Sequence, residues 1–146
     1  MAVKKELIGK RHPPKSYEVG REKIREYARA VGEENPVYHD PDAARAAGFA
    51  NVVAPPMFCV VYSSPAMGPA VLDPELGINL ALMVHGSQEF EWQEPVVAGD
   101  EITTEVTVKD IYEKNGMEFY VWESQSKKQD GTPVVKGTWT NIVRAG

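Results

Sequence analysis

The longest segment of the chain without a charged residue runs from Ala46 to Leu72. A helix of that length could cross a bilayer, but four prolines interrupt the segment: Pro55, Pro56, Pro65 and Pro69. Proline has no amide hydrogen, so such a helix leaves backbone carbonyls unpaired, and hydrocarbon cannot satisfy them. We therefore predict no membrane insertion. The segment is expected to form a buried central helix that begins at Pro55 and Pro56.

The sequence after residue 72 alternates between apolar and polar side chains, which is typical of β-strands. Four segments show it: QEFEWQ (88–93), EITTEVTV (101–108), MEFYVW (117–122) and VVKGTWTNIV (134–143). KNG at 114–116 and QDG at 129–131 predict hairpin turns, because Asn-Gly and Asp-Gly supply the positive φ that tight turns require. Helices followed by a strand meander predict one α+β domain over residues 1–146, in which an antiparallel sheet wraps around the central apolar helix.

Two shorter helices are expected before the central one. Four apolar residues share one helical face within roughly 21–31: Ile24, Tyr27, Ala28 and Val31. Gly32 is expected to end this helix. Asp40 then precedes Pro41 and an alanine-rich run, which predicts an N-cap, a proline at the first helical position and a helix closed by Gly48.

Composition limits the domain count and the partners. A chain of 146 residues with 42% hydrophobic and 25% charged residues has room for one compact domain. Its net charge is -5 and its basic residues are scattered among acidic ones, so we predict no nucleic-acid partner. The N-terminus shows no apolar stretch typical of a secretory signal, and we expect a cytoplasmic location.

The cysteine and histidine pattern predicts no metal site and no cofactor. Cys59 is the single cysteine, so no internal disulfide can form, and it is interpreted as a core residue. No Cys/His spacing suits zinc. His12 stands beside two prolines and is expected to be solvated.

Both faces of the strand MEFYVW carry large apolar groups. Met117, Phe119 and Val121 alternate with Tyr120 and Trp122. One interpretation is two exposed aromatic side chains with ordinary hydrogen bonds. We favour a protein interface on the second face of the sheet.

The segment GEENPVYHDPDAARAAGF at 32–49, with the helix-plus-meander order, resembles the MaoC-type hot-dog hydratases and dehydratases. Those enzymes share a pattern of the form G-D-x-N-P-[LIV]-H-x-D-P-x-x-A, followed by a small residue, His, Gly and Met at the start of the central helix. EPVVAGDEI at 94–102 resembles the family's strand-turn segment, in which Gly99 and Asp100 make the turn. The resemblance covers most of the chain.

The chemistry implied by this resemblance needs a His, assisted by an Asp, to move protons between substrate and water. Aligning Gly32 with the family glycine puts Glu33 at the Asp and Tyr38 at the His. Tyrosine has an unperturbed pKa of about 10, which makes it a poor base near neutral pH. His39 is one position beyond the family His; it is either a replacement base after a local shift or a solvated or structural residue.

The implied chemistry also needs a backbone N–H to hold the thioester oxygen. Aligning Ala54 and Met57 with the family's small residue and Met puts Pro55 at the His and Pro56 at the Gly that supplies this amide. Proline has no N–H. Losing one such donor typically costs about 10² to 10³ in kcat, so we expect no catalytic residue of the family type in this chain.

The residues that shape the segment are retained: Asn35, Pro36, Asp40, Pro41 and Gly48. The chain also resembles the non-catalytic, substrate-binding subunit of actinobacterial heterodimeric (3R)-hydroxyacyl-acyl carrier protein dehydratases, the FAS1-like dehydratase N-terminal type. YEVGREKIREYA at 17–28 and the Ala-Pro before the central helix carry that similarity. It implies a partner hot-dog subunit that supplies Asp and His, and a thioester substrate on acyl carrier protein or CoA.

The residues expected to bind substrate are Asn35, Pro56, Met57, Phe58 and His85. Met57 and Phe58 suit either an acyl channel or an ordinary core. For Val60, Val61 and Met67, further along the helix, the core is favoured. His85 either faces the acyl site or ends a loop.

Three further functions stay open. The first is a homomeric hydratase of short enoyl-CoA, in which Glu33 and His39 act as acid and base. The second is a hot-dog thioesterase, in which Glu33 or Glu34 activates water. The third is a homodimeric acyl-binding protein without chemistry. A candidate docking surface for an acidic carrier is the most basic stretch of the chain: Arg11, Lys15, Arg21, Lys23, Arg25 and Arg29.

Overall fold

The computed structural model describes residues 3–146. Within that range the helices are α1 (Arg21–Ala30), α2 (Pro41–Ala46) and α3 (Cys59–Val71). The strands are β1 (Arg11–Glu18), β2 (Met83–Trp92), β3 (Glu101–Lys114), β4 (Met117–Lys127) and β5 (Pro133–Val143). Short 3-10 turns occupy η1 (Lys5–Leu7), η2 (Pro36–Tyr38), η3 (Pro56–Phe58) and η4 (Leu80–Leu82). Because η3 leads directly into α3, the central helix begins at the predicted proline pair.

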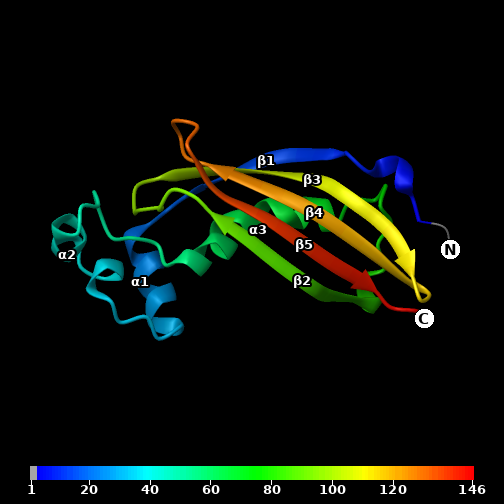
Figure 1. Ribbon diagram of the computed structural model, residues 1–146, viewed down its shortest axis with the longest axis horizontal. Coiled ribbons are helices and arrows are strands. Elements are labelled where there is room, and N and C mark those ends of the chain that lie inside the picture. Colours follow the sequence, from blue (N-terminus) through cyan, green and yellow to red (C-terminus); the bar gives the residue numbers. More distant parts are fainter. Residues whose placement is uncertain (1–2) are drawn as a thin grey trace.

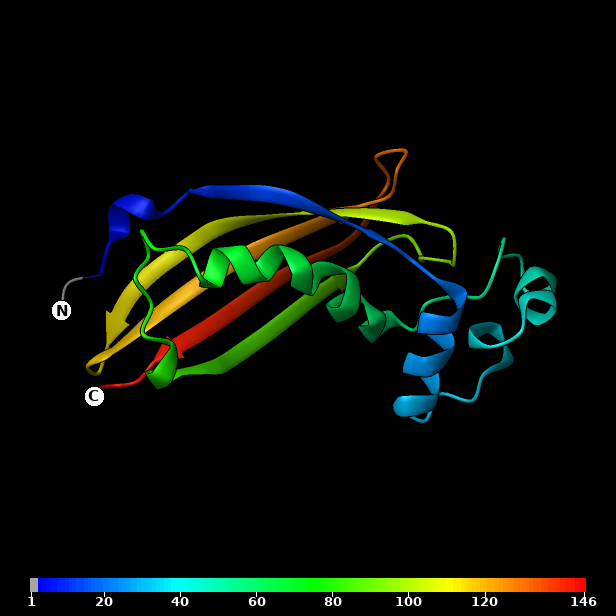
Figure 2. The same cartoon turned by 180° about the vertical axis from the view of Figure 1, so that it is seen from behind.

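The strands form one five-stranded antiparallel sheet in the order β1-β3-β4-β5-β2. α3 lies against one face of this sheet, and α1 and α2 lie beyond one end of it (Figures 1 and 2). This arrangement confirms the predicted α+β architecture of a sheet around a central helix. β2 and β1 are the two edge strands.

α3 buries one face along its length, and the expected burial holds for that face: Cys59, Tyr62, Ser63, Ala66, Met67 and Ala70. Ser64, Pro65 and Pro69 on the other face are exposed. The first turns of α3 join a core cluster with α1 and the segment before the helix, and its later turns pack against β3, β4 and β5. The buried Ser63 hydroxyl donates to the carbonyl of Cys59 at 2.5 Å, so this polar group is satisfied within the helix. No helix in the described part of the chain is long and apolar enough to cross a membrane.

The predicted hairpin turns and the predicted Asp40 N-cap are confirmed. Asn115 and Gly116 have φ of 53° and 75° in the β3–β4 hairpin, and Gly131 has φ of 88° in the β4–β5 connection. α1 ends at Ala30, one residue before the predicted end, and Gly32 follows with φ of 76°. The Asp40 side chain accepts a hydrogen bond from the Asp42 amide at 2.9 Å, as expected of an N-cap.

The burial of the β4 side chains contradicts one of the two interpretations of this strand. Tyr120 and Trp122 are only 4% and 0% exposed because they lie in the core with α3, so the interpretation as exposed aromatics is wrong. Met117, Phe119 and Val121 are half-buried on the outer face. A protein interface on that outer face stays a prediction.

His12 is buried, so the expectation of a solvated side chain is wrong. It is 6% exposed, and its Nε2 lies 2.8 Å from Oδ2 of Asp73, which follows α3. Lys10 Nζ lies 2.6 Å from the same carboxylate oxygen and 3.1 Å from Glu75. These contacts join β1 and the residue before it to the segment after α3.

Candidate functional site

The start of α3 is positioned by a short stretch of backbone pairing between distant segments. The Ala54 amide donates to the Val96 carbonyl at 2.8 Å, and the Ala98 amide donates to the Val52 carbonyl at 3.0 Å. Val53 and Val97 form an isolated antiparallel bridge between them. This pairing holds the proline pair where β2 ends and α3 begins.

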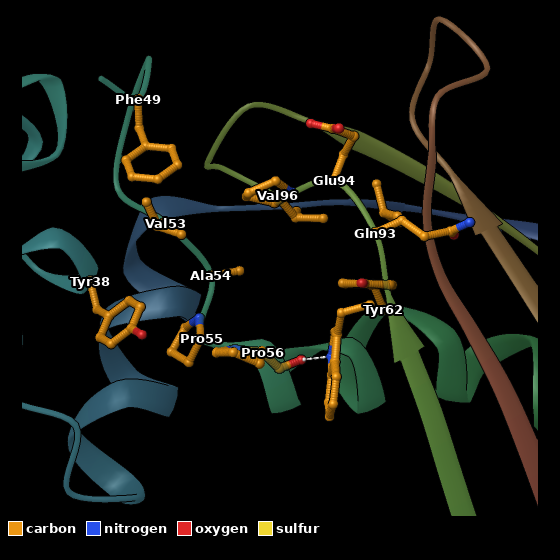
Figure 3. A pocket seen from close by; sticks show the side chains of 13 residues that line it. Tyr38, Phe49, Val53, Ala54, Pro55, Pro56, Tyr62, Gln93, Glu94 and Val96 are labelled. Carbon is orange, nitrogen blue, oxygen red and sulfur yellow. Dashed lines mark hydrogen bonds between the residues drawn. The ribbon is translucent and has the colours of Figure 1, made fainter. Parts of the chain in front are cut away.

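Pro55 and Pro56 remove two amide hydrogens at this place. The first N–H groups of a helix have no intrahelical acceptor and are therefore the ones available to a ligand. Here Pro55 is the N-cap residue and Pro56 the first residue of η3. The Pro56 carbonyl accepts a hydrogen bond of 2.8 Å from Nε1 of Trp92, the last residue of β2 (Figure 3). At residues 55 and 56 the backbone therefore has no N–H donor, and the Pro56 carbonyl is held by the Trp92 side chain.

A cavity of about 210 Å³ lies beside the proline pair. Most of its wall is apolar: Phe49, Val53, Ala54, Pro55, Pro56 and Val96. Its polar side chains are Tyr38, Tyr62, Gln93 and Glu94, and Trp92 also lines it. A second hollow of about 370 Å³ shares the two prolines and is lined as well by Tyr27, Val31, Glu33 and Met57.

The structure places the predicted acid and base positions on different sides of the prolines. Tyr38 lines the first cavity, and burial, together with the charge of Glu33, raises the pKa of its hydroxyl. Glu33 lines the second hollow. His39 Nε2 lies 2.6 Å from the Glu33 carbonyl, and the His39 carbonyl accepts from Arg25 Nε at 2.7 Å. The His39 ring is therefore engaged in holding the segment after α1.

The predicted substrate-binding residues separate into two groups. Pro56 and Met57 line the hollows, and Met57 is 45% exposed. Phe58 is fully buried in an aromatic cluster with Tyr27, Tyr17 and Tyr62 and lines neither hollow.

Two further predicted residues lie away from the cavity wall. The Asn35 side chain accepts from the Val37 amide at 3.1 Å and caps η2. His85 lies on β2 with its ring 6.5 Å from that of Trp139. It is seven residues from Trp92, or about 23 Å along an extended strand. A substrate-binding role for either residue stays a prediction.

The cavity residues that the sequence does not predict include Trp92 and Tyr62. Trp92 was recognised only as part of an alternating strand, and its hydrogen bond to Pro56 joins segments that are 36 residues apart. Tyr62 follows Phe58 by one helical turn, and this i, i+4 spacing in the central helix is the signal that could have found it.

The predicted basic docking surface does not form one patch. Arg11 lies on the outer face of the sheet beside Glu105 and Glu123. Arg25 is occupied by the His39 carbonyl and by an ion pair with Glu22. Exposed cations of the stretch remain on α1: Arg21, Lys23 and Arg29. Among residues 3–146, no group of three or more His, Cys, Asp or Glu side chains is placed to hold a metal ion.

Solved structures with the same fold define the class of protein. The chain is 28% identical to a chain of the C-terminally truncated HadBC (3R-hydroxyacyl-ACP dehydratase) complex from Mycobacterium tuberculosis, with a TM-score of 0.77 over 93% of this chain and 96% of that one. A MaoC-like dehydratase gives 30% identity and a TM-score of 0.81 over 96% of this chain and 43% of that one. The ChsH1-ChsH2 complex from the same bacterium, at 21% identity and a TM-score of 0.74, shares the fold over 92% of this chain and 89% of that one. The protein has the hot-dog fold and is similar to the MaoC-like and hydroxyacyl dehydratases.

Sequence relatives define the family more narrowly. The chain belongs to the family described as FAS1-like, dehydratase domain region, whose model matches residues 6–137. It is 41% identical to a UPF0336 protein of Saccharopolyspora erythraea over 99% of this chain and 93% of the relative. It is 44% identical to a UPF0336 protein of Clavibacter michiganensis over 99% of this chain and 97% of the relative.

Proposed function

We propose that the chain is the substrate-binding, non-catalytic subunit of a heterodimeric (3R)-hydroxyacyl-thioester dehydratase of fatty-acid elongation, and that it lines the acyl channel. The observation that carries the proposal is the proline pair at the start of α3 beside an apolar cavity. A site that binds the acyl group needs the cavity. A site that performs the elimination also needs a donor to the thioester oxygen, which Pro55 and Pro56 do not provide.

The proton transfers of the reaction also favour a non-catalytic role for this chain and a catalytic role for its partner. Dehydration removes a proton from the α-carbon and protonates the departing hydroxyl, so it requires a base and an acid near neutral pH. Burial raises the pKa of Tyr38 above its usual value of about 10, so this phenol stays protonated. The His39 ring is bound to a backbone carbonyl. On this proposal the partner hot-dog subunit supplies acid and base.

The cavity is suited to part of an acyl chain. Its volume of about 210 Å³ is below the range of roughly 300–1,000 Å³ typical of sites that enclose a whole ligand. A methylene that moves from water into such an apolar wall contributes about 0.8 kcal/mol, or roughly a fourfold change in Kd. Affinity should therefore rise with chain length until the channel is filled.

The proposed partner and carrier follow from relatives and from charge. HadBC and ChsH1-ChsH2 are complexes, which favours a heterodimer over a homodimer for this chain. An acidic carrier would meet the exposed cations of α1, and its thioester would enter from the end of the sheet where α1 lies. The proposed location is the cytoplasm, and the proposal requires no cofactor.

The first test is loss of enoyl-thioester absorbance with the purified chain, with a catalytic hot-dog subunit encoded beside it, and with both. We expect no hydration by the chain alone, and activity of the mixture above that of the partner alone. Hydration by the isolated chain that disappears in Glu33→Ala or His39→Ala would instead establish the homomeric hydratase.

A thioesterase and a homodimeric acyl-binding protein would each behave differently with the same substrates. A thioesterase would release free thiol from an acyl thioester, detected with a thiol reagent, and Glu33→Gln or Glu34→Gln would stop the release. A homodimeric acyl-binding protein would bind long-chain thioesters and form no complex with the neighbouring subunit in sedimentation.

The carrier surface is tested by charge reversal on α1. Arg21→Glu with Arg29→Glu should weaken binding of the acyl carrier protein at low salt, with less effect at high salt. Arg11→Glu, on the outer face of the sheet, is the matched control. Equal affinity of all three proteins would remove α1 as the docking surface.

A further inference from the structure

Tyr62 carries a hydroxyl that the proposed function does not use. The residue lies on α3 and is 3% exposed. Its pKa is raised by burial and, to a lesser degree, by the charge of Cys59; no hydrogen bond from the described part of the chain acts on it. Buried polar side chains nearly always have a partner in native proteins. The Tyr62 hydroxyl has no partner within the described chain but keeps accessible surface, and Tyr62 lines the cavity, so a molecule in the cavity, water or a ligand, supplies its partner.

The cavity is where that partner can lie. Tyr62 is part of its wall, opposite Tyr38 (Figure 3). The side chains of Gln93 and Glu94 also belong to the wall, but Figure 3 shows the Glu94 carboxylate and the Gln93 amide turned away from the centre. The hydroxyls of the two tyrosines are the polar groups left to meet a ligand, and both are hydrogen-bond donors while protonated.

The charge of the wall restricts the ligand further. None of the described residues that line the cavity is Lys, Arg or His. A carboxylate or phosphate would thus enter an apolar space without a cation and beside Glu94, which is unfavourable. The occupant has to be uncharged, largely apolar, and equipped with an oxygen that accepts a hydrogen bond.

We propose that Tyr62 is a specificity-determining residue whose hydroxyl donates to an uncharged oxygen of the bound acyl group. This inference rests on the proposed function and names the class of acyl ligand that the cavity selects: an oxygen-bearing chain in preference to a plain hydrocarbon. The accepting oxygen is either the thioester carbonyl or a hydroxyl or keto oxygen on the chain. Both present the same neutral acceptor to the phenol.

The test compares ligands that differ only in that oxygen. Octanoyl-pantetheine carries the thioester carbonyl, S-octylpantetheine has a methylene in its place, and S-(3-hydroxyoctyl)pantetheine carries the oxygen on the chain alone. Calorimetry on the wild-type protein and on Tyr62→Phe gives the dissociation constants. We expect at least one oxygen-bearing ligand to bind the wild type about three- to tenfold tighter than S-octylpantetheine, and Tyr62→Phe to abolish the preference.

Tyr17→Phe is the matched control. Its ring packs at 6.5 Å from the same Phe58, and Tyr17 lies outside the cavity wall. This variant should keep the preference. Tyr62→Phe should melt no lower than the wild type, because it removes a hydroxyl without a partner and leaves the ring in place.

The remaining outcomes overturn one proposal or both. A preference that survives in Tyr62→Phe, or equal wild-type affinity for all three ligands, refutes the role of Tyr62. If S-octyl and S-decyl ligands then still bind with increasing affinity, the acyl-binding function stands alone. If no ligand binds to the chain or to its complex with the partner, both proposals fail.

Discussion

Replacing Asp73 with Asn should weaken the fold in a way that depends on pH. The Asp73 carboxylate is 8% exposed and lies 2.8 Å from His12 and 2.6 Å from Lys10. Burial raises its pKa, but hydrogen bonds from Lys10, the Glu75 amide and His12 outweigh burial and lower the pKa from 3.8 to about 2. Asparagine keeps the shape and removes the charge.

The magnitude follows from this shift. One pKa unit corresponds to about 1.4 kcal/mol, so the shift from 3.8 to about 2 stabilises the wild type by about 2.5 kcal/mol at neutral pH. Screening around Lys10, whose side chain is 28% exposed, reduces this to ~1–2 kcal/mol. Because the folded pKa is below the unfolded one, the contribution is complete above pH 4 and is lost as the pH falls toward 2. About half of it should remain at pH 3.

Urea unfolding of both proteins between pH 7 and pH 3 measures this difference. We expect Asp73→Asn to be less stable by ~1–2 kcal/mol at pH 7, with the gap narrowing below pH 4. Glu75→Gln is the control, since Glu75 meets the same Lys10 at 3.1 Å with a side chain that is 65% exposed; it should cost less than about 1 kcal/mol. A gap that is the same at pH 7 and pH 3 would refute the electrostatic account.

Other variants test packing, burial and the cavity wall. Gly137→Ala would place a methyl carbon 2.5 Å from a buried side-chain oxygen and should cost about 1–3 kcal/mol in urea unfolding. A methyl group in Gly68→Ala meets no atom within 4 Å, and the change should raise stability by about 0.5–1 kcal/mol because alanine favours the helix. Equal effects of Gly137→Ala and Gly68→Ala on stability would contradict the difference in packing around the two glycines. Burial raises the pKa of the Cys59 thiol to about 11, so a thiol reagent at pH 8 should label it only after unfolding, and rapid labelling of the folded protein would contradict its burial. Trp92→Phe removes the hydrogen bond to Pro56 and should weaken binding of long acyl ligands, at a cost of about 1 kcal/mol or less in stability. Unchanged binding would show that this hydrogen bond does not contribute to the acyl site.

Local signals predicted most of the fold because each depends on a few neighbouring residues. The proline pair, the Asp40 cap and the Asn-Gly turn all act within one helical or hairpin turn. β1 was missed because Pro13 and Pro14 argue against a strand. The structure accommodates them because β1 is an edge strand and its register with β3 shifts between His12 and Lys15. An edge strand can lose amide donors that a central strand cannot.

Non-local contacts account for what the sequence could not predict. His12 is buried because Asp73, 61 residues later, comes to lie beside it. The cavity wall includes Trp92, whose side chain donates to the Pro56 carbonyl across 36 residues. The alternation of a strand also does not say which of its faces meets the helix, so Tyr120 and Trp122 were placed outside instead of in the core.

On the proposed function the site has lost its chemistry and kept its fold, and the proline pair gives a physical reason for this. The first amides of a helix have no intrahelical acceptor, so a proline there removes no helical hydrogen bond, and its fixed φ suits the helix start. Those same amides are the ones that a catalytic site would use as donors. Prolines at positions 55 and 56 are therefore compatible with a stable helix start, but they are not compatible with the use of these two amides as donors. On the proposed function, a partner subunit that supplies the chemistry removes the need for these donors, and what the start of α3 must still do is hold Trp92 and the cavity wall in place.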